Sequence, residues 1–288
     1  HTGEAMEHYQ KYWSLLHSVA YRMTGSIQDA EDIVQDLFAD LQEKSIDQIN
    51  KPYLIKSVTN RCINFLQSAR KKREVYVGEW LPEPSLRLPD QNPADLAEKE
   101  ETVSYAFLVA MSRLNPVERA VFMFRDVFGY HYKEISSIIE KSEANCRKIH
   151  SRIKHKLSGE LSLTSRPKEE RQLAELFIAS AKTGDFDEFA RKLTEEAVLY
   201  TDGGGKVKSA IRPIYGRSRI YAFFKGIASK GRLAGHIRHA QINGQRGVLI
   251  ERGKKPIYAI CFAWSPECDL INNIYIVSNP DKLKHITF

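Results

Sequence analysis

The sequence predicts a multi-domain protein in which two all-α helical domains are followed by an α+β domain. Residues 7–70 and 94–161 carry apolar residues at helical spacing, which predicts two helical blocks. Four prolines within residues 74–93 forbid a regular helix between these blocks. Beyond Arg166–Pro167, two expected helices are followed by short alternating runs that are typical of antiparallel strands.

The composition is that of a globular protein with a basic surface. The 288 residues suffice for two or three domains, and the net charge of +7 suits a polyanionic partner. The longest apolar run, Ile257–Trp264, is too short to span a bilayer, and the first twenty residues lack the apolar segment of a signal peptide. The four cysteines have no metal-type spacing. We therefore expect a cytoplasmic protein with reduced thiols, no metal site and no cofactor.

The first helical block contains an amphipathic helix between Ser26 and Lys44. Its apolar stripe consists of Ala30, Ile33, Val34, Leu37, Phe38 and Leu41. Its polar face carries Asp29, Glu31, Asp32, Gln35 and Asp36. No basic residue interrupts residues 27–42, which is unusual in an otherwise basic chain. This face is a candidate docking site for a basic partner; the alternative is a solvated face that keeps the helix soluble.

A second helix is expected to begin at Pro52 and to run into a basic cluster. Its polar candidates are Lys56, Asn60, Arg61, Asn64, Arg70, Lys71, Lys72 and Arg73. Asparagine is a poor helix former, so two asparagines on one face indicate a chemical use. Amide side chains can hydrogen-bond exposed base edges while the cations hold phosphates. The alternative is a face that serves solubility and capping.

Residues 132–157 predict two short helices joined by a tight turn at Glu140–Lys141–Ser142. The first helix has an apolar stripe at helical spacing, and we expect a second stripe formed by Cys146, Ile149, Ile153 and Leu157. The outward residues of the second helix are Glu143, Asn145, Arg147, Lys148, Ser151 and Arg152. A basic helix braced by a short apolar partner is what major-groove reading requires. The alternative is a solvated helix in an ordinary bundle.

The C-terminal part predicts helices near 169–182, 185–193 and 217–228. The expected strands are Val198–Thr201, His236–Asn243, Gly247–Arg252, Pro256–Trp264 and Cys268–Val277. Three glycines after Asp202 predict a tight loop, but the segment lacks the hydroxyl residue and the spacing of a phosphate-binding loop. Asp202, His236 and His239 could in principle form an acid/base set. Nothing identifies a nucleophile, so we expect no catalytic residue and no enzyme.

Taken together, these residues resemble a bacterial sigma factor of the extracytoplasmic-function (ECF) group over residues 8 to about 160. DAEDIVQDLF (29–38) resembles the region-two helix that docks on the β′ clamp of core RNA polymerase. YLIKSVTNRCINFL (53–66) with the following RKKR resembles the segment that recognises and melts the −10 promoter element. The segments 114–139 and 142–157 resemble region four, which reads the −35 element. The resemblance therefore implies core polymerase and promoter DNA as partners.

Three short motifs resemble a subgroup that carries a SnoaL-like C-terminal extension: YVGEWLPEP (76–84), DGGGK (202–206) and NPDKL (279–283). The resemblance implies a cone-shaped α+β domain that modulates the factor in cis; any small ligand of this domain is unknown. We expect a regulatory interdomain contact formed by Trp80, Leu81, Pro82, Asp202, Gly203, Gly204, Gly205, Asn279, Pro280 and Asp281. Glu79 and Lys206 stand where a proline and an arginine are common in the subgroup, and His150 stands where region four usually carries a leucine.

The expected domains are 7–75 for core and −10 binding, 76–94 as a linker, 95–161 for −35 binding and 169–288 for regulation. The expected function is that of a transcription initiation factor. Two alternatives stand beside it. One is a stand-alone helix-turn-helix regulator with a ligand-sensing domain, and the other is a SnoaL-type enzyme fused to a DNA-binding module.

Overall fold

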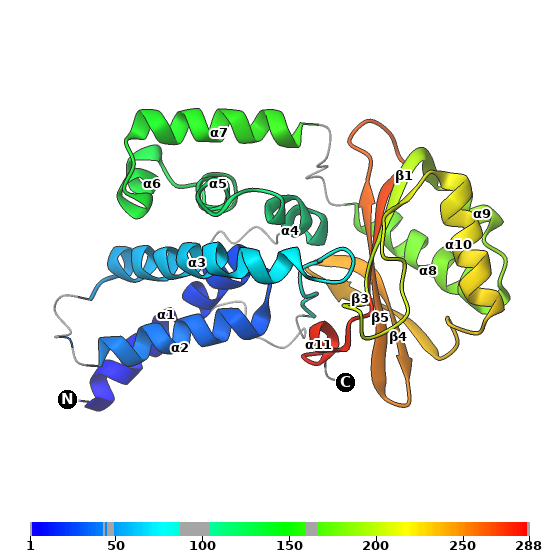
Figure 1. Cartoon of the computed structure of the whole chain (residues 1–288), viewed down its shortest axis with the longest axis horizontal. Helices are drawn as coiled ribbons and strands as arrows, with labels where there is room; N and C mark the ends of the chain where they lie inside the picture. Colours follow the sequence, from blue (N-terminus) through cyan, green and yellow to red (C-terminus); the bar gives the residue numbers. More distant parts are fainter. Residues whose placement is uncertain (1, 43, 45–48, 87–103, 159–165, 287–288) are drawn as a thin grey trace. The chain divides into compact units, whose positions relative to one another are not determined.

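The computed structural model describes the whole chain except residues 1, 43, 45–48, 87–103, 159–165 and 287–288 (Figure 1). The described residues divide into two compact units. Unit 1 holds those of 1–74 and 110–157, and unit 2 holds those of 75–88, 103–109 and 158–286. The segment that includes Trp80 therefore belongs to the C-terminal unit.

Unit 1 begins with three helices, α1 (Thr2–Thr24), α2 (Ile27–Leu41) and α3 (Lys51–Glu74). The Ser26 side chain caps α2 by accepting a hydrogen bond from the backbone N–H of Asp29. The buried residues of α2 are Ala30, Ile33, Val34, Leu37 and Leu41, as the sequence pattern predicts. Phe38 is only half-buried.

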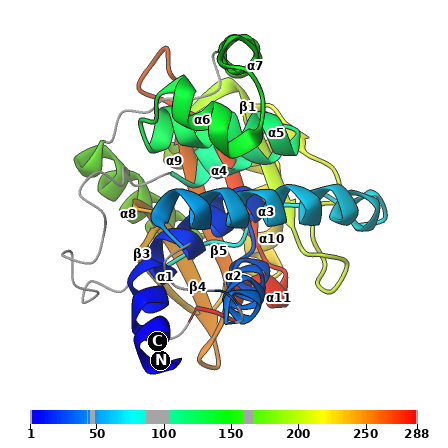
Figure 2. The ribbon, with the colours of Figure 1, turned by 90° about the vertical axis from the view of Figure 1, so that its left-hand side faces the viewer.

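The second half of unit 1 is a helix-turn-helix. Its elements are α5 (Pro116–Phe122), the π-helical turn η3 (Met123–Val127), α6 (Tyr132–Ile139) and α7 (Glu143–Leu157). Asn115 forms a capping box with Glu118, which begins α5. Glu140 takes the left-handed conformation, with φ 55°, and so turns the chain between α6 and α7. Within unit 1, α3 lies between the α1–α2 pair and the α5–α6 pair (Figures 1 and 2).

Unit 2 is built on a six-stranded sheet in the order β2-β1-β6-β5-β4-β3. The strands are β1 (Leu193–Asp202), β2 (Ile214–Tyr215), β3 (His236–Ile242), β4 (Gln245–Arg252), β5 (Lys255–Trp264) and β6 (Ile271–Val277). Among the described strands, the β1–β6 pair is parallel and the other pairs are antiparallel. The helices are α8 (Pro167–Thr183), α9 (Asp187–Arg191), α10 (Arg217–Ser229) and α11 (Pro280–Leu283), together with the first residues of α4 (Tyr105–Ser112). The predicted α+β class of this part is confirmed.

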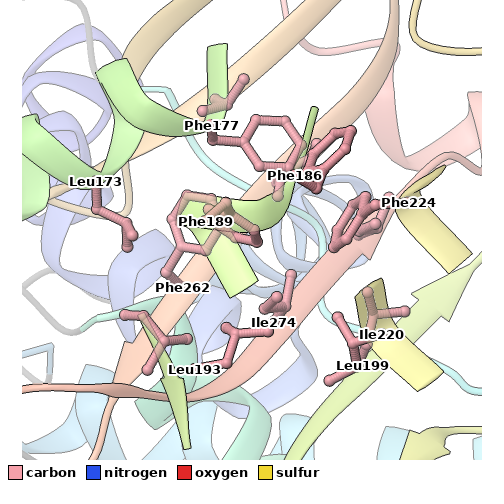
Figure 3. Close-up of a cluster of buried hydrophobic side chains, with 14 of the residues drawn as sticks. Leu173, Phe177, Phe186, Phe189, Leu193, Leu199, Ile220, Phe224, Phe262 and Ile274 are labelled. Carbon is pink, nitrogen blue, oxygen red and sulfur yellow. The ribbon is translucent and has the colours of Figure 1, made fainter. Parts of the chain in front are cut away.

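One face of the sheet is covered by α8, α9 and α10 and encloses a cluster of phenylalanines (Figure 3). Phe177, Phe186, Phe189 and Phe224 point toward one another and are each at most 1% exposed. The rings of Phe186 and Phe224 stack with centroids 5.2 Å apart, and Phe177 meets Phe189 edge-on at 5.2 Å. These distances are those of tightly packed aromatic pairs. The phenylalanines therefore fill much of the space between the sheet and its helices.

Removing one of these rings is expected to destabilise unit 2 strongly. Phe224→Ala leaves a cavity that the neighbouring rings cannot close, so the free energy of unfolding should fall by about 3–5 kcal/mol. Calorimetry of the purified chain measures this as a lower Tm for unit 2. Phe223→Ala is the matched control, because its ring is only half-buried and should cost clearly less. Equal losses in the two variants would contradict this account of the core.

The other face of the sheet is covered by the linker and by short helical segments of unit 2. Leu81, Tyr105 and Leu283 pack there on a patch that includes Tyr275 and Val277. The linker is thus part of the hydrophobic core of the C-terminal unit, which explains why its first half is more apolar than a spacer requires.

Candidate nucleic-acid interface and linker contact

The acidic residues predicted for polymerase docking lie along the outer face of α2. Asp32, Gln35 and Asp36 are exposed, whereas Asp29 and Glu31 are half-buried. Gln28 Nε2 donates a hydrogen bond of 3.0 Å to Asp32 Oδ1, so one carboxylate has an amide partner on its own helix. The apolar stripe faces inward, so the carboxylates of Asp32 and Asp36 remain accessible to a basic partner.

The polar residues predicted for −10 binding lie on α3, and among the described residues three of these cations pair with carboxylates of unit 1. Arg70 Nε lies 3.7 Å from Glu74 Oε1, one turn later on the same helix. Lys56 Nζ lies 2.8 Å from Glu140 Oε1, in the turn before α7, and this contact lowers the pKa of Glu140. Arg61 pairs with Asp40 at the end of α2. Asn64 is exposed and Asn60 is half-buried. The polar face of α3 therefore carries an exposed amide, that of Asn64, beside cations that are already in ion pairs.

The basic end of α3 is divided between solvent and the protein interior. Arg70 and Lys72 are exposed, while the Lys71 side chain lies outside the described part of the structure. Arg73 instead donates a hydrogen bond of 3.0 Å to the carbonyl oxygen of Thr24, at the C-terminus of α1. Burial lowers the pKa of its guanidinium. In this conformation Arg73 caps a helix, as a cation at a helix C-terminus does.

The residues predicted for −35 reading lie on α7. Arg147, Lys148, Ser151 and Arg152 are exposed, and Glu143 and Asn145 are half-buried. The Ser142 hydroxyl accepts a hydrogen bond from the Asn145 backbone and so begins the helix.

The apolar stripe of α7 differs from the predicted one at a single position. The structure buries His150 and leaves Ile149 half-exposed. The reason is polar: the His150 ring lies within hydrogen-bond distance of Asp126 and Tyr132, so burial leaves neither ring nitrogen without a partner.

Arg119 on α5 is a buried cation that the sequence did not single out. It is 4% exposed, and its guanidinium donates to the carbonyl oxygens of Met23 (2.5 Å), Ser112 (3.1 Å) and Leu114 (3.0 Å). Burial, and secondarily the nearby Arg73, lowers the pKa of Arg119 to about 9, which leaves it charged at neutral pH. Arg119 thus joins α5 to the C-terminus of α1. The sequence hints at its burial only because Arg119 directly precedes the apolar run of residues 120–124.

In unit 2, Asp202 forms the centre of the linker contact. It ends β1, is 0% exposed and accepts hydrogen bonds on both carboxylate oxygens. Oδ1 accepts from the Tyr76 hydroxyl at 2.5 Å. Oδ2 accepts from the Leu81 backbone N–H at 2.8 Å and from Lys282 Nζ at 2.6 Å. A single carboxylate therefore holds two points of the linker and one of α11.

Lys282 completes this contact from α11. Its Nζ also donates to the Leu81 carbonyl oxygen at 2.5 Å and lies 4.1 Å from the centroid of the Trp80 ring. Asn279 Nδ2 donates to the Tyr76 hydroxyl at 2.8 Å. Burial, and then Asp202, raises the pKa of Tyr76, so its hydroxyl stays protonated and donates. We call Tyr76, Leu81, Asp202, Asn279 and Lys282 the linker clamp.

The glycines of DGGGK let the chain approach this clamp closely. Gly204 and Gly205 have φ of 62° and 72°, which side chains other than glycine rarely adopt. A Cβ atom on Gly204 would clash with Asn279, and one on Gly205 would lie 3.1 Å from Val77. A Cβ atom on Gly203 would clash with the Ser209 side chain. Lys206 pairs with Asp281, which joins the two motifs at the surface, and Pro280 is exposed.

The linker has two further anchors on the same sheet face. The Tyr105 hydroxyl donates to the Pro82 carbonyl oxygen at 2.6 Å, and its ring meets Tyr275 edge-on at 5.7 Å. Ser85 and Asn243 exchange two hydrogen bonds of 2.9 Å. The sequence did not single out Tyr105 or Lys282 as site residues, although Lys282 lies inside the NPDKL motif.

The acid/base set considered from the sequence is not assembled. Asp202 ends β1, whereas His236 and His239 lie on β3 at the far edge of the sheet, with three strands between. At about 4.8 Å per strand, these groups are too far apart to share a proton. His239 Nδ1 is 2.8 Å from Arg246 Nη1. Among the described residues, no cluster of three metal-ligating side chains occurs, and no described helix is long and apolar enough to cross a membrane.

Two family models match the chain: Sigma-70 region 2 over residues 8–72 and Sigma-70, region 4 over residues 104–157. The ECF RNA polymerase sigma factor SigJ of Mycobacterium tuberculosis is 30% identical over 240 residues, which cover 81% of this chain and 76% of SigJ. The probable ECF RNA polymerase sigma factor SigI of the same species is 29% identical over 174 residues, 59% of this chain and 60% of SigI. The crystal structure of SigJ covers 97% of this chain and 98% of its own, with a TM-score of 0.75 and 24% identity, which shows a shared fold.

Proposed function

Because the chain belongs to the ECF RNA polymerase sigma factors, we propose a role for each surface described above. A sigma factor is an initiation factor and not an enzyme: it binds core polymerase and directs it to promoter DNA. We assign residues 7–75 to core and −10 binding, 95–161 to −35 binding and 169–288 to regulation, with 76–94 as the linker. The cytoplasm, which holds polymerase and promoters, is the place of action.

We assign the acidic face of α2 to the β′ clamp of the polymerase. Asp32 and Asp36 support this assignment, because they are exposed on a helix whose opposite stripe is buried. A charged interface of this kind steers association and fixes orientation.

Charge reversal on this face is expected to weaken core binding. Asp32→Lys and Asp36→Lys place cations opposite a basic partner, so the apparent Kd for core polymerase should rise about tenfold or more in the double variant. A pull-down or titration with purified core measures it at low salt. Glu169→Lys is the control for each single variant, because it makes the same charge change at an exposed site on α8. Unchanged binding in the double variant would count against the assignment.

We assign capture of the opened −10 element to α3. Unstacked bases offer edges to the amides of Asn60 and Asn64, and these contacts offset an unpairing cost of a few kcal/mol per base. Lys56, Arg61, Arg70 and Lys72 supply the cations that hold phosphates. For Lys56 and Arg61 this role requires DNA phosphates to replace Glu140 and Asp40.

We assign regulation in cis to the linker clamp. The observation that carries this proposal is the buried Asp202 carboxylate, which fastens the linker between the two DNA-binding regions to the C-terminal unit. In the free protein the clamp limits the separation that regions two and four can take. Core polymerase must draw the linker away to place both regions on one promoter, so the clamp acts as an inhibitor.

The packing of unit 2 supports action through the linker rather than through a ligand held inside the fold. The space between the sheet and α8, α9 and α10 is occupied by phenylalanine rings in van der Waals contact. The decisive experiment is run-off transcription with limiting core polymerase, in which a variant that opens the clamp yields more transcript.

A further inference from the structure

Three hydrogen-bonded side chains lie behind the recognition helix α7. His150 on α7 is 5% exposed; its Nε2 lies 2.6 Å from Asp126 Oδ2 and its Nδ1 lies 2.9 Å from the Tyr132 hydroxyl. Asp126 accepts only, so Nε2 carries a proton and donates to it. In the neutral tautomer Nδ1 then accepts from Tyr132. The order Asp126–His150–Tyr132 connects η3, α7 and the start of α6.

The Tyr132 ring, at the end of this hydrogen-bonded series, contacts Arg147, which projects outward from α7. The guanidinium carbon of Arg147 lies 5.3 Å from the centroid of the Tyr132 ring, and that of Arg125 lies 4.3 Å from the same centroid. Arg147 also donates a hydrogen bond of 3.2 Å to Glu143, one turn earlier on α7. Two partners therefore restrain an exposed side chain that otherwise samples many rotamers.

Restraint of this kind matters for an arginine that reads DNA. A guanidinium recognises guanine through two parallel hydrogen bonds, so the plane of the group must match the plane of the base. An arginine stacked on an aromatic ring is pre-oriented and loses less rotamer freedom when it binds.

We infer that Tyr132 is a positioning residue for −35 recognition, held in place by Asp126 and His150, and that it sets base preference through Arg147 without touching DNA. The inference rests on the proposed role of α7. It also gives His150 a function, since a leucine at this position could not hold the Tyr132 hydroxyl. The competing explanation is that Asp126, His150 and Tyr132 only stabilise the helix-turn-helix.

The test is run-off transcription by the reconstituted holoenzyme on a promoter panel that carries every single substitution of the −35 element. Arg147→Ala should reduce discrimination about tenfold at one base pair. Tyr132→Leu should reduce discrimination at that same base pair, and the double variant should lose no more than Arg147→Ala alone. Tyr132→Phe and His150→Leu keep the ring and should give smaller losses there.

Tyr130→Leu is the matched control. It removes a tyrosine whose ring stacks on Phe124 with centroids 5.4 Å apart, and it should lower Tm without changing base preference. An unchanged panel for Arg147→Ala would refute the proposed role of Arg147 itself. If Arg147→Ala changes the base preference but Tyr132→Leu keeps the wild-type preference, the positioning role of Tyr132 is wrong while the role of Arg147 stands. If Tyr132→Leu and Tyr132→Phe lower transcription equally on all promoters, as the control does, the three residues only stabilise the helix-turn-helix.

Discussion

Asp202→Asn is expected to open the linker clamp and to raise transcription at limiting core polymerase. Oδ1 of the carboxylate accepts from Tyr76, and Oδ2 accepts from Leu81 and Lys282. An asparagine has one oxygen and one NH2 group, so its NH2 group must face the donor or donors on one of these two sides. It also leaves Lys282, whose side chain is 8% exposed, without its counter-charge. Breaking a buried ion pair costs about 3–5 kcal/mol, so much of the free energy that holds the linker should be lost.

Two measurements separate an open clamp from a damaged domain. Amide hydrogen exchange should accelerate in the linker peptide containing Leu81, whose N–H donates to Asp202. Exchange in the peptides around Phe177 and Phe224 should change much less. Run-off transcription should rise several-fold when core is scarce, and the gain should shrink when core is in excess.

The matched control for this variant is Asp269→Asn. It makes the same chemical change in an ion pair with Arg166, away from the clamp, where the Asp269 side chain is 92% exposed, so it should have little effect on transcription. If Asp202→Asn speeds exchange at the linker but leaves transcript yield at the control level, the clamp is structural and the proposed regulation is wrong.

Arg119→Leu is expected to destabilise unit 1 by about 3 kcal/mol or more. Hydrogen bonds to a charged group contribute about 1.5–3 kcal/mol each, and the variant leaves the carbonyl oxygens of Met23, Ser112 and Leu114 without this donor. Arg119→Lys should recover only part of the loss, because a single ammonium group cannot reproduce the fork of the guanidinium. Urea unfolding followed by circular dichroism of the helices measures both variants.

Arg152→Ala is the control for this second prediction, since Arg152 is exposed on α7 and its loss should change stability by less than about 0.5 kcal/mol. A loss for Arg119→Leu no larger than that of Arg152→Ala would show that the buried guanidinium is dispensable. Such a result would mean that water replaces it at the C-terminus of α1.

Local patterns in the sequence were sufficient for the longer helices, but not for the short helix α11 or for every strand. The buried residues of α2 follow from helical period alone, because one face of a helix must meet the core. Strand β2 has two residues, which is too short for any periodic signal. Strand β1 begins at Leu193, earlier than predicted, because Leu193 pairs with Ile271 of β6 across a register shift. Pairing with a distant strand leaves no local trace.

The candidate site divides in the same way. Resemblance brought Trp80, Asp202 and Asn279 into one expected contact, and the structure does place their motifs together. The role of Lys282 could not be predicted, because a lysine is buried only when a carboxylate far away in the sequence compensates its charge. The helical period placed Ile149 in the buried stripe and left out His150 for a related reason: the polar partners that bury a histidine lie elsewhere in the sequence.

If α3 holds promoter phosphates as proposed, the carboxylates that pair with Lys56 and Arg61 should affect how promoter affinity responds to ionic strength. DNA binding releases condensed counterions in proportion to the phosphates neutralised, and the slope of log affinity against log salt counts them. Lys56 and Arg61 enter this exchange already neutralised by Glu140 and Asp40. Cations freed from internal partners contribute less net electrostatic gain than bare ones. On the proposed role of α3, these two ion pairs lower the attraction of the free factor for DNA phosphates of any sequence.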